Sequence, residues 1–269
     1  MGFFLGIDIG SLTGKAVIID DDATIKAQQI IYVKKLPIHT VNALMEDVLP
    51  KVGIEDISEV TYCVGTGYGR RKIPLANETI SEITCHGTGA HHVLPSVRTV
   101  IDIGGQDCKV IRLDAKGNLK NFIMNEKCAA GTGRYLEIMA KTLNLTLDEL
   151  GTLSLKAKAP LSLASKCSIY ARLEVMQLIS DGLKKPEIAA AINRAMAERV
   201  INLAEKVGIE EDVAVSGGVA KNIGVVTNME RIIGIKFKKF PIDPQIIGAL
   251  GAALIAKRAY QKLYKEEKN

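Results

Sequence analysis

Glycine-containing turns in this sequence carry side chains suited to binding phosphate. The first turn joins two apolar runs and consists of Gly10, Ser11, Leu12, Thr13, Gly14 and Lys15. Its glycines allow backbone N–H groups to converge on an anion, and its hydroxyl and ammonium groups add further donors. Asp8, at the end of the entering run, is suited to hold Mg2+ through water, because hard cations prefer oxygen ligands. The first turn therefore predicts a phosphate and magnesium site.

Two further turns extend the pattern. The second consists of Gly104, Gly105, Gln106 and Asp107. In it, Gln106 is suited to orient an attacking water and Asp107 to serve the metal. The third turn runs from an apolar strand into a helix and contains Gly217, Gly218, Val219 and Asn222. Paired glycines admit a flat base or ribose, and a helix N-terminus favours phosphate. Any one turn alone is most simply an ordinary hairpin, but together they suggest a bound nucleotide.

The five cysteines are odd in number and widely spaced, so structural disulfides are not expected. Each thiol is then packing, a metal ligand or a reactive group. Cys63 lies within a predicted strand and Cys108 within a predicted hairpin, so packing is the better interpretation of both.

Two other patterns are interpreted as structural. The Cys-His pair at 85–86 and the His-His pair at 91–92 superficially suggest zinc, but their spacing fits no standard ligand pattern. Gly87 and Gly89 would also interrupt any helix face, so we expect no metal there. The glycine-rich run 65–69 follows a strand but lacks the spacing of a dinucleotide fingerprint, which favours a structural turn.

The strands that must hold the first two turns repeat each other. Segments 3–20 and 100–114 each read as an apolar strand, a tight turn and a second apolar strand. At a constant offset of 94, Asp8 falls on Asp102, Gly10 on Gly104, Lys15 on Lys109 and Asp20 on Asp114. Four identities in one register indicate two related halves.

The remaining elements alternate strands with helices. Helices are predicted at 39–49, 133–143, 168–179, 186–207, from 219 and at about 246–264, and strands at 59–65 and 212–216. This order predicts an α/β protein of two similar lobes with a nucleotide cleft between them. We expect the lobes at 1–95 and 96–269, with the last helix packing back onto the first lobe.

Composition restricts the class of protein. The chain has 269 residues, 47% of them hydrophobic and 24% charged, which excludes disordered, collagen-like and coiled-coil proteins. The longest uncharged stretches, 83–97 and 244–256, are shorter than the roughly 18 apolar residues of a membrane span. No signal peptide is visible, so we expect a cytoplasmic protein. The net charge is only +5 and the basic residues are scattered along the chain, so nucleic acid is not an expected partner.

The motifs together resemble a known superfamily. The runs D-I-G-S-L-T from Asp8, D-I-G-G-Q-D from Asp102 and S-G-G-V-A-K-N from Ser216 look like two phosphate motifs and an adenosine motif. These are the motifs of the acetate and sugar kinase, heat-shock chaperone and actin superfamily, which implies two duplicated actin-like (ribonuclease H-like) lobes.

Further segments resemble one branch of that superfamily. They are N-E-K-C-A-A-G-T-G-R-Y-L-E at 125–137, S-K-C-S at 165–168 and P-Q-I-I-G-A-L-G-A-A at 244–253. With them the whole chain is similar to the ATPase activators of (R)-2-hydroxyacyl-CoA dehydratases, in the BadF/BadG/BcrA/BcrD ATPase family. The resemblance implies that the three turns and Gln245 bind ATP or ADP, and that Cys128 and Cys167 are ligands of an iron–sulfur cluster.

The resemblance implies a homodimer with one [4Fe–4S] cluster between its subunits. ATP would drive a low-potential electron onto a partner iron–sulfur enzyme, a 2-hydroxyacyl-CoA dehydratase or a related double-cluster reductase, with ferredoxin or flavodoxin as donor. The chemistry agrees, because such a cluster needs four thiolates and two chains would each supply two. Both cysteines precede predicted helices, whose N-termini favour an anionic cluster and the thiolate form. The alternative is a pair of buried structural thiols.

Two rival functions stay open at this point. A small-molecule, sugar-type kinase of the same superfamily would need a substrate pocket and a carboxylate base, but no cluster. A non-catalytic, actin-like or chaperone-like nucleotide switch would likewise have no use for Cys128 and Cys167. Anaerobically purified protein would be brown if it holds the cluster and colourless in either rival case.

Overall fold

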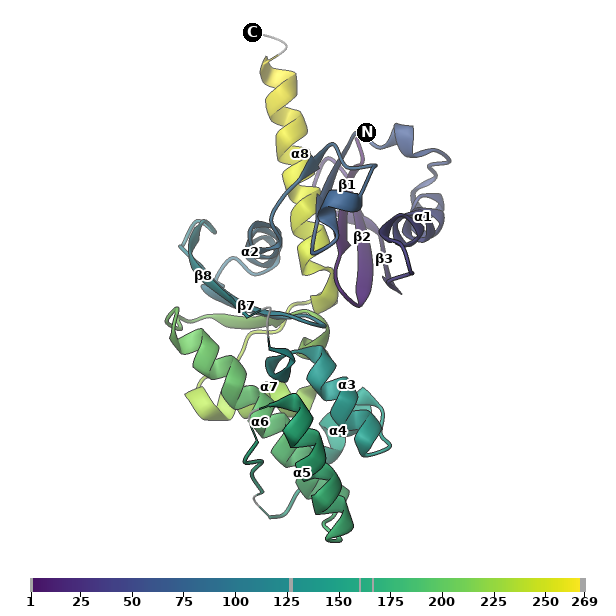
Figure 1. Ribbon diagram of the computed structural model, residues 1–269. Coiled ribbons are helices and arrows are strands. Elements are labelled where there is room, and N and C mark those ends of the chain that lie inside the picture. Colours follow the sequence, from purple (N-terminus) through teal and green to yellow (C-terminus); the bar gives the residue numbers. More distant parts are fainter. Residues whose placement is uncertain (1, 126–127, 160, 166, 267–269) are drawn as a thin grey trace. The chain divides into compact units, whose positions relative to one another are not determined.

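The computed structural model describes residues 2–125, 128–159, 161–165 and 167–266 (Figure 1). Glu126, Lys127 and Lys166, which belong to the two cysteine segments, lie outside the described residues. The chain divides into two compact units. The first comprises Met1–Val100, Leu113–Lys120 and Phe240–Asn269, and the second Ile101–Arg112 and Asn121–Lys239. The lobe limits at 95 and 96 stay a prediction.

The first unit is built around a five-stranded sheet in the order β3-β2-β1-β4-β5. Its strands are β1 (Phe4–Ile9), β2 (Thr13–Ile19), β3 (Ile25–Tyr32), β4 (Tyr62–Thr66) and β5 (Glu78–Thr79). Its helices are α1 (Pro37–Val48), α2 (Glu82–Val93) and α8 (Ile247–Glu266). β1 runs antiparallel to β2 and parallel to β4. The C-terminal ends of β1 and β4 therefore lie side by side, with Asp8 paired to Thr66.

Alternating side chains of β1 divide the core of this unit into two layers. Leu5, Ile7 and Ile9 pack in one buried cluster with residues of α1, whereas Phe4 packs in another with residues of α8. Successive side chains of a strand point to opposite faces, so one apolar strand serves both layers. Figure 1 shows α1 on one side of the strands and α8 on the other.

The second unit has a four-stranded sheet in the order β8-β7-β6-β9. Its strands are β6 (Thr99–Ile103), β7 (Cys108–Leu113), β8 (Leu119–Asn125) and β9 (Val213–Ser216). Its helices are α3 (Gly133–Thr142), α4 (Leu147–Ser154), α5 (Ser168–Ser180), α6 (Lys185–Glu205) and α7 (Ile223–Ile233). Figure 1 shows these helices gathered on one side of the sheet, and a single buried cluster joins residues of β6 and β7 to α3, α6 and α7.

Several predicted elements need correction. The strand expected at 59–65 is β4, and its first three positions are taken by a 3-10 turn at Ile57–Glu59 and the residues after it. The helix expected from Val219 is α7, which begins at Ile223 after a 3-10 turn at Gly218–Lys221. The helices α2 and α4 and the strands β3, β5 and β8 are additional. Among the described residues, every helix is too short or too polar to cross a membrane.

The prediction that Gly87 and Gly89 interrupt a helix is wrong, because both lie inside α2. A Cβ atom on Gly89 would come within 2.2 Å of the carbonyl oxygen of Ile247, and one on Gly251 within 1.8 Å of that of Cys85. The glycines therefore allow α2 and α8 to approach backbone to backbone. The close packing of α2 against α8 offsets the low helix propensity of glycine.

Candidate nucleotide and thiol sites

The first phosphate turn connects β1 to β2 and is closed by a hydrogen bond from the Gly10 N–H to the Thr13 carbonyl, 3.0 Å long. Asp8 and Lys15 are cross-strand partners, and the Lys15 ammonium lies 3.3 Å from the Asp8 carboxylate. Asp8 is buried, so this ion pair fixes a carboxylate at the base of the turn. The pairing puts a carboxylate acceptor and an ammonium donor at the base of the turn.

The second turn repeats this geometry between β6 and β7. The Gly104 N–H donates to the Asp107 carbonyl over 3.0 Å, at the positions 94 residues after Gly10 and Thr13. Lys109 is 2% exposed and lies 3.4 Å from the Asp102 carboxylate and 2.9 Å from that of Asp107. Gln106 is exposed at the tip of the turn, where its amide can meet a ligand from solvent.

The third turn is joined to the second. The Ser216 hydroxyl at the end of β9 donates to the Asp102 carboxylate over 2.9 Å. Gly217 has a φ of 83°, and a Cβ atom there would lie 2.3 Å from the carbonyl oxygen of Ile103. Only glycine fits this approach and this left-handed backbone. Within the second unit the structure therefore brings two predicted nucleotide motifs together.

The side chains of two other predicted nucleotide residues are engaged in the protein. Asn222 caps α7 by accepting the Val225 N–H over 3.0 Å, and the Val219 side chain packs in the core. Gly218 begins the 3-10 turn Gly218–Lys221, which contains Val219 and ends just before Asn222. Gln245 lies in the first unit, in a 3-10 turn just before α8, and its own N–H donates to the Asp243 side chain.

A glycine that the sequence analysis treated as structural has the same surroundings as Gly217. Gly67 follows β4 with a φ of 87°, and a Cβ atom there would lie 2.3 Å from the Asp8 carboxylate. Both units thus place a left-handed glycine against the aspartate of their first strand. The run 65–69 lacked any motif that would have revealed this equivalence, because the matching positions are not at the offset of 94.

The five cysteines fall into two groups by exposure. Cys128 and Cys167 are exposed, and Cys63, Cys85 and Cys108 are buried. Burial raises the pKa of Cys63 and of Cys85 to about 12, and it raises that of Cys108 as well. Because the thiolate is the form that binds metals, the three buried thiols are poor ligands. The exposed pair is therefore the only cysteine pair suited to a shared cluster.

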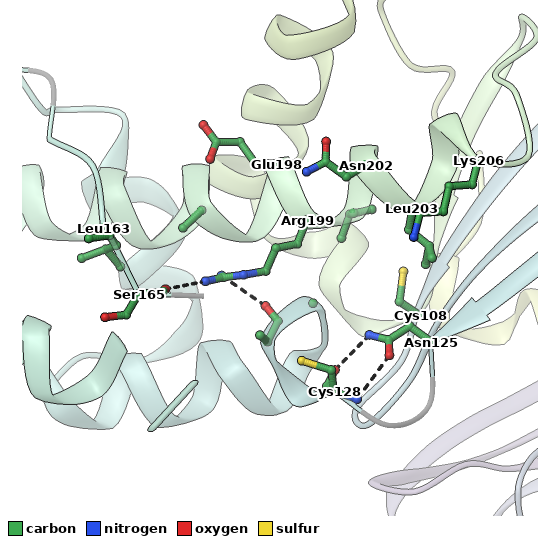
Figure 2. A pocket seen from close by; sticks show the side chains of 15 residues that line it. Cys108, Asn125, Cys128, Leu163, Ser165, Glu198, Arg199, Asn202, Leu203 and Lys206 are labelled. Atoms are coloured by element: carbon green, nitrogen blue, oxygen red, sulfur yellow. Dashed lines mark hydrogen bonds between the residues drawn. The ribbon is translucent and has the colours of Figure 1, made fainter. Parts of the chain in front are cut away.

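Cys128 is linked through the backbone to the second phosphate turn. The Asn125 side chain holds it from both sides, accepting its N–H over 3.2 Å and donating to its carbonyl over 3.0 Å (Figure 2). A 3-10 turn at Ala129–Gly131 follows, and α3 begins at Gly133. The first two N–H groups of α3 donate to the carbonyls of Gly104 and Gly105, over 2.9 and 2.8 Å. A displacement of the turn would therefore reach the start of α3 directly.

Cys167 is the N-cap residue of α5. The segment before it is tied back to that helix, because the Glu174 carboxylate accepts the N–H groups of Ala164 and Ser165 over 2.8 and 3.0 Å. The helix then presents an apolar side to solvent. Its exposed large apolar residues are Ile169, Tyr170, Leu173, Met176 and Ile179. Such a continuous apolar face is typical of a surface that is covered in an assembly.

Comparison with known proteins places this geometry in a family. The pattern of the BadF/BadG/BcrA/BcrD ATPase family matches residues 5–256. The chain belongs to this ATPase family. It is 43% identical over 260 residues to the activator of lactoyl-CoA dehydratase of Anaerotignum propionicum, covering 97% of this chain and 99% of that protein. It is 31% identical to one of the subunits of benzoyl-CoA reductase from Thauera aromatica, covering 96% of this chain and 94% of that protein.

Solved structures agree with the family. The activator of 2-hydroxyisocaproyl-CoA dehydratase from Clostridium difficile, solved with bound ADPNP, is 39% identical and has a TM-score of 0.93, covering 99% of this chain and 98% of that one. The ethanolamine utilization protein EutJ from Carboxydothermus hydrogenoformans shares the fold alone, at 16% identity and a TM-score of 0.59. The predicted family and the predicted actin-like fold class are both confirmed.

Proposed function

We propose that this member of the family is an ATP-dependent one-electron reductase that activates an iron–sulfur dehydratase or reductase. The observation that carries the proposal is the exposed thiol pair, Cys128 and Cys167, of which the first is connected by α3 to a phosphate turn. The relatives named as a dehydratase activator and as part of a reductase support this class of partner. Ferredoxin or flavodoxin is the proposed donor and the cytoplasm the proposed compartment.

The thiols fit a cluster that two chains share. A [4Fe–4S] cluster takes four thiolates. Among the described residues of one chain, no group of three or more His, Cys, Asp or Glu side chains is placed to hold a metal. A homodimer would bring Cys128 and Cys167 of both subunits together and complete the ligand set. When bound there, the cluster would supply one-electron transfer at low potential.

The nucleotide would be held by the three turns. Backbone N–H groups of the first two turns, with Lys15, are suited to the phosphates, and Asp8 and Asp107 to Mg2+ through water. Gln106 would orient the water that attacks the terminal phosphate. The glycines of the third turn leave room for the adenosine, and Gln245 would contribute from the first unit.

Coupling would run through the hydrogen bonds between α3 and the second turn. A terminal phosphate drawn against Gly104 and Gly105 would shift their carbonyls, which accept the N–H groups of Gly133 and Arg134. The start of α3 would follow, and with it the segment that carries Cys128. ATP binding would thus change the surroundings of Cys128 without touching it.

The proposal is tested on anaerobically prepared protein. We expect a brown protein with about two irons per chain, the share of a four-iron cluster divided between two chains. It should hydrolyse ATP and, with reduced ferredoxin or flavodoxin, restore activity to an oxidised 2-hydroxyacyl-CoA dehydratase only when ATP is present. A colourless protein that phosphorylates a sugar would instead identify the kinase alternative.

A further inference from the structure

One arginine contacts both cysteine segments. Arg199 lies on α6, and its guanidinium donates to the carbonyl of Ser165 over 2.9 Å and to that of Ala130 over 3.4 Å (Figure 2). Ala130 is two residues after Cys128, and Ser165 is two residues before Cys167. The two thiols, which are 39 residues apart in sequence, therefore share one cationic anchor.

An aromatic ring lies against this anchor. The guanidinium carbon of Arg199 lies 5.0 Å from the centre of the Tyr135 ring, and Tyr135 is fully buried in α3. A cation over an aromatic face is attracted to it, and a guanidinium keeps its donors in one rigid plane. With the ring beside it, the Arg199 guanidinium donates from one terminal nitrogen to the carbonyl of Ala130 and from the other to that of Ser165.

A hollow beside α6 makes the anchor important. A cavity of about 390 Å3 is lined by both cysteine segments and by α6, and the Arg199 side chain is part of this lining (Figure 2). Cys128, Gly131 and Ala164 line it together with Glu198 of α6. Close packing is what normally fixes one segment against another. Where the segments border a hollow, their separation depends instead on the hydrogen bonds that cross it.

We propose that Arg199 is a positioning residue that sets the separation of the Cys128 and Cys167 segments. Neutral side chains of similar length would keep the contact with the Tyr135 ring but lose both donors. Lysine would keep the charge but, as a point donor without the planar fork, would reach one carbonyl at a time. The use of the two thiols as cluster ligands rests on the proposed function. Their fixed separation does not.

The test measures that separation in iron-free protein. Cys128 and Cys167 are labelled with nitroxide, which the buried thiols should not accept, and labelled chains are diluted with unlabelled ones so that distances within one chain dominate pulsed EPR. We expect Arg199→Met to make the distance distribution about twice as broad as in the parent protein, because the lost constraint frees both segments. Arg199→Lys should lie between the two.

The matched control is Arg194→Met on the same helix. Arg194 is exposed and its guanidinium donates to the Glu198 carboxylate over 2.8 Å. The distance distribution in Arg194→Met should therefore equal that of the parent. Circular dichroism and nucleotide binding confirm folding. If Arg199→Met does not fold, Arg199→Lys carries the test.

Distributions as narrow in the folded Arg199 variants as in the parent overturn the proposal. Broadened distributions support it, and in that case reconstituted Arg199→Met should also retain less iron than Arg199→Lys. If the distributions broaden while even the parent protein binds no iron, the positioning role stands and the proposed electron-transfer function fails. The two ideas are therefore separable.

Discussion

Three of the five cysteines lie in the apolar interior, where the charged thiolate loses its hydration. Cys63 is packed within β4 among residues of both sheet and helices, and Cys108 begins β7. The exposed thiols keep their hydration. The chemistry of each cysteine is therefore set by its solvation and not by its residue type alone.

The first prediction concerns these thiols. Cys128→Ser or Cys167→Ser should remove most of the iron from the anaerobic protein and weaken the proposed dimer, because a serine hydroxyl is a poor substitute for a thiolate ligand. Cys63→Ser and Cys108→Ser are the controls, and iron content in them should stay near that of the parent. Iron analysis and size-exclusion chromatography measure both. Equal iron in all four variants would contradict the ligand assignment.

The second prediction concerns Glu174. Burial by itself would raise the pKa of this carboxyl, but the N–H groups of Ala164 and Ser165 outweigh it and hold the pKa below its ordinary value of 4.5. Because this pKa is lower in the folded than in the unfolded chain, the ionised carboxylate stabilises the Cys167 segment at pH values above the unfolded pKa. The stabilisation is lost as the pH falls through the folded pKa. The amide shifts of Ala164 and Ser165 in NMR should therefore titrate with a midpoint below 4.5. A midpoint at or above that value, or an unchanged titration in Glu174→Gln, would contradict it.

At the scale of helices and strands, turn chemistry and apolar periodicity are local, and they are visible in the sequence. The hairpins of β1–β2 and β6–β7 and the helices α3, α5 and α6 were predicted on that basis. The helix α2 was not, because its glycines oppose a helix locally and are favoured only by the close approach of α8. Arg199 was missed for a similar reason, since its two acceptors are backbone carbonyls and no motif marks them.

The third prediction tests the contact between α2 and α8. Gly251→Ala should lower the free energy of unfolding by about 3 kcal/mol, because the new methyl group would meet a backbone carbonyl that cannot turn away. Arg258→Ala, at an exposed position of α8, is the control and should change stability by less than about 0.5 kcal/mol. Chemical denaturation measures both. Similar midpoints for the two variants would show that the helices can separate freely.

The fourth prediction tests the phosphate turns. Asp8→Ala and Gln106→Ala should each slow ATP hydrolysis by about 10²-fold, since they are assigned to the metal and to the attacking water. Iron content should be unchanged, because neither residue touches a thiol segment. Lys116→Ala, at an exposed position between β7 and β8 and outside every predicted nucleotide motif, is the control and should hydrolyse ATP at the parent rate. A normal rate in both variants would place the phosphate site elsewhere.

At the scale of the molecule, the question is whether nucleotide and thiols communicate. Linkage requires that, if ATP changes the cluster's properties, the cluster also changes ATP affinity. The route proposed here is short, because two hydrogen bonds join the second turn to α3, and α3 begins five residues after Cys128. It lies wholly within the second unit, so it can be tested without reference to the arrangement of the units.

The fifth prediction follows. Mg-ATP should make iron removal by a chelator several-fold faster and should lower the midpoint potential by tens of millivolts. A potential shift of this size is comparable to the coupling free energy of roughly 1–3 kcal/mol that is typical between two sites in a protein. Gly131→Pro should damp both responses while sparing nucleotide binding, because it stiffens the turn between Cys128 and α3. Chelation rates and redox titrations are the measurements. Identical values with and without Mg-ATP in the parent protein would refute coupling, even with both sites filled.

The two equivalent hairpins, β1–β2 and β6–β7, differ in one charged residue. Both keep the same backbone turn and the same aspartate–lysine pair, but Thr13 of the first copy corresponds to Asp107 of the second. That one difference leaves the first hairpin formally neutral and gives the second an extra negative charge beside Lys109. After an ancestral hairpin was duplicated, a change at a single codon would have been enough to give the copies different ionic preferences. Exchanging the two residues, Thr13→Asp with Asp107→Thr, would move the extra carboxylate to the first hairpin. Mg2+ binding to this variant would show whether the cation depends on that carboxylate.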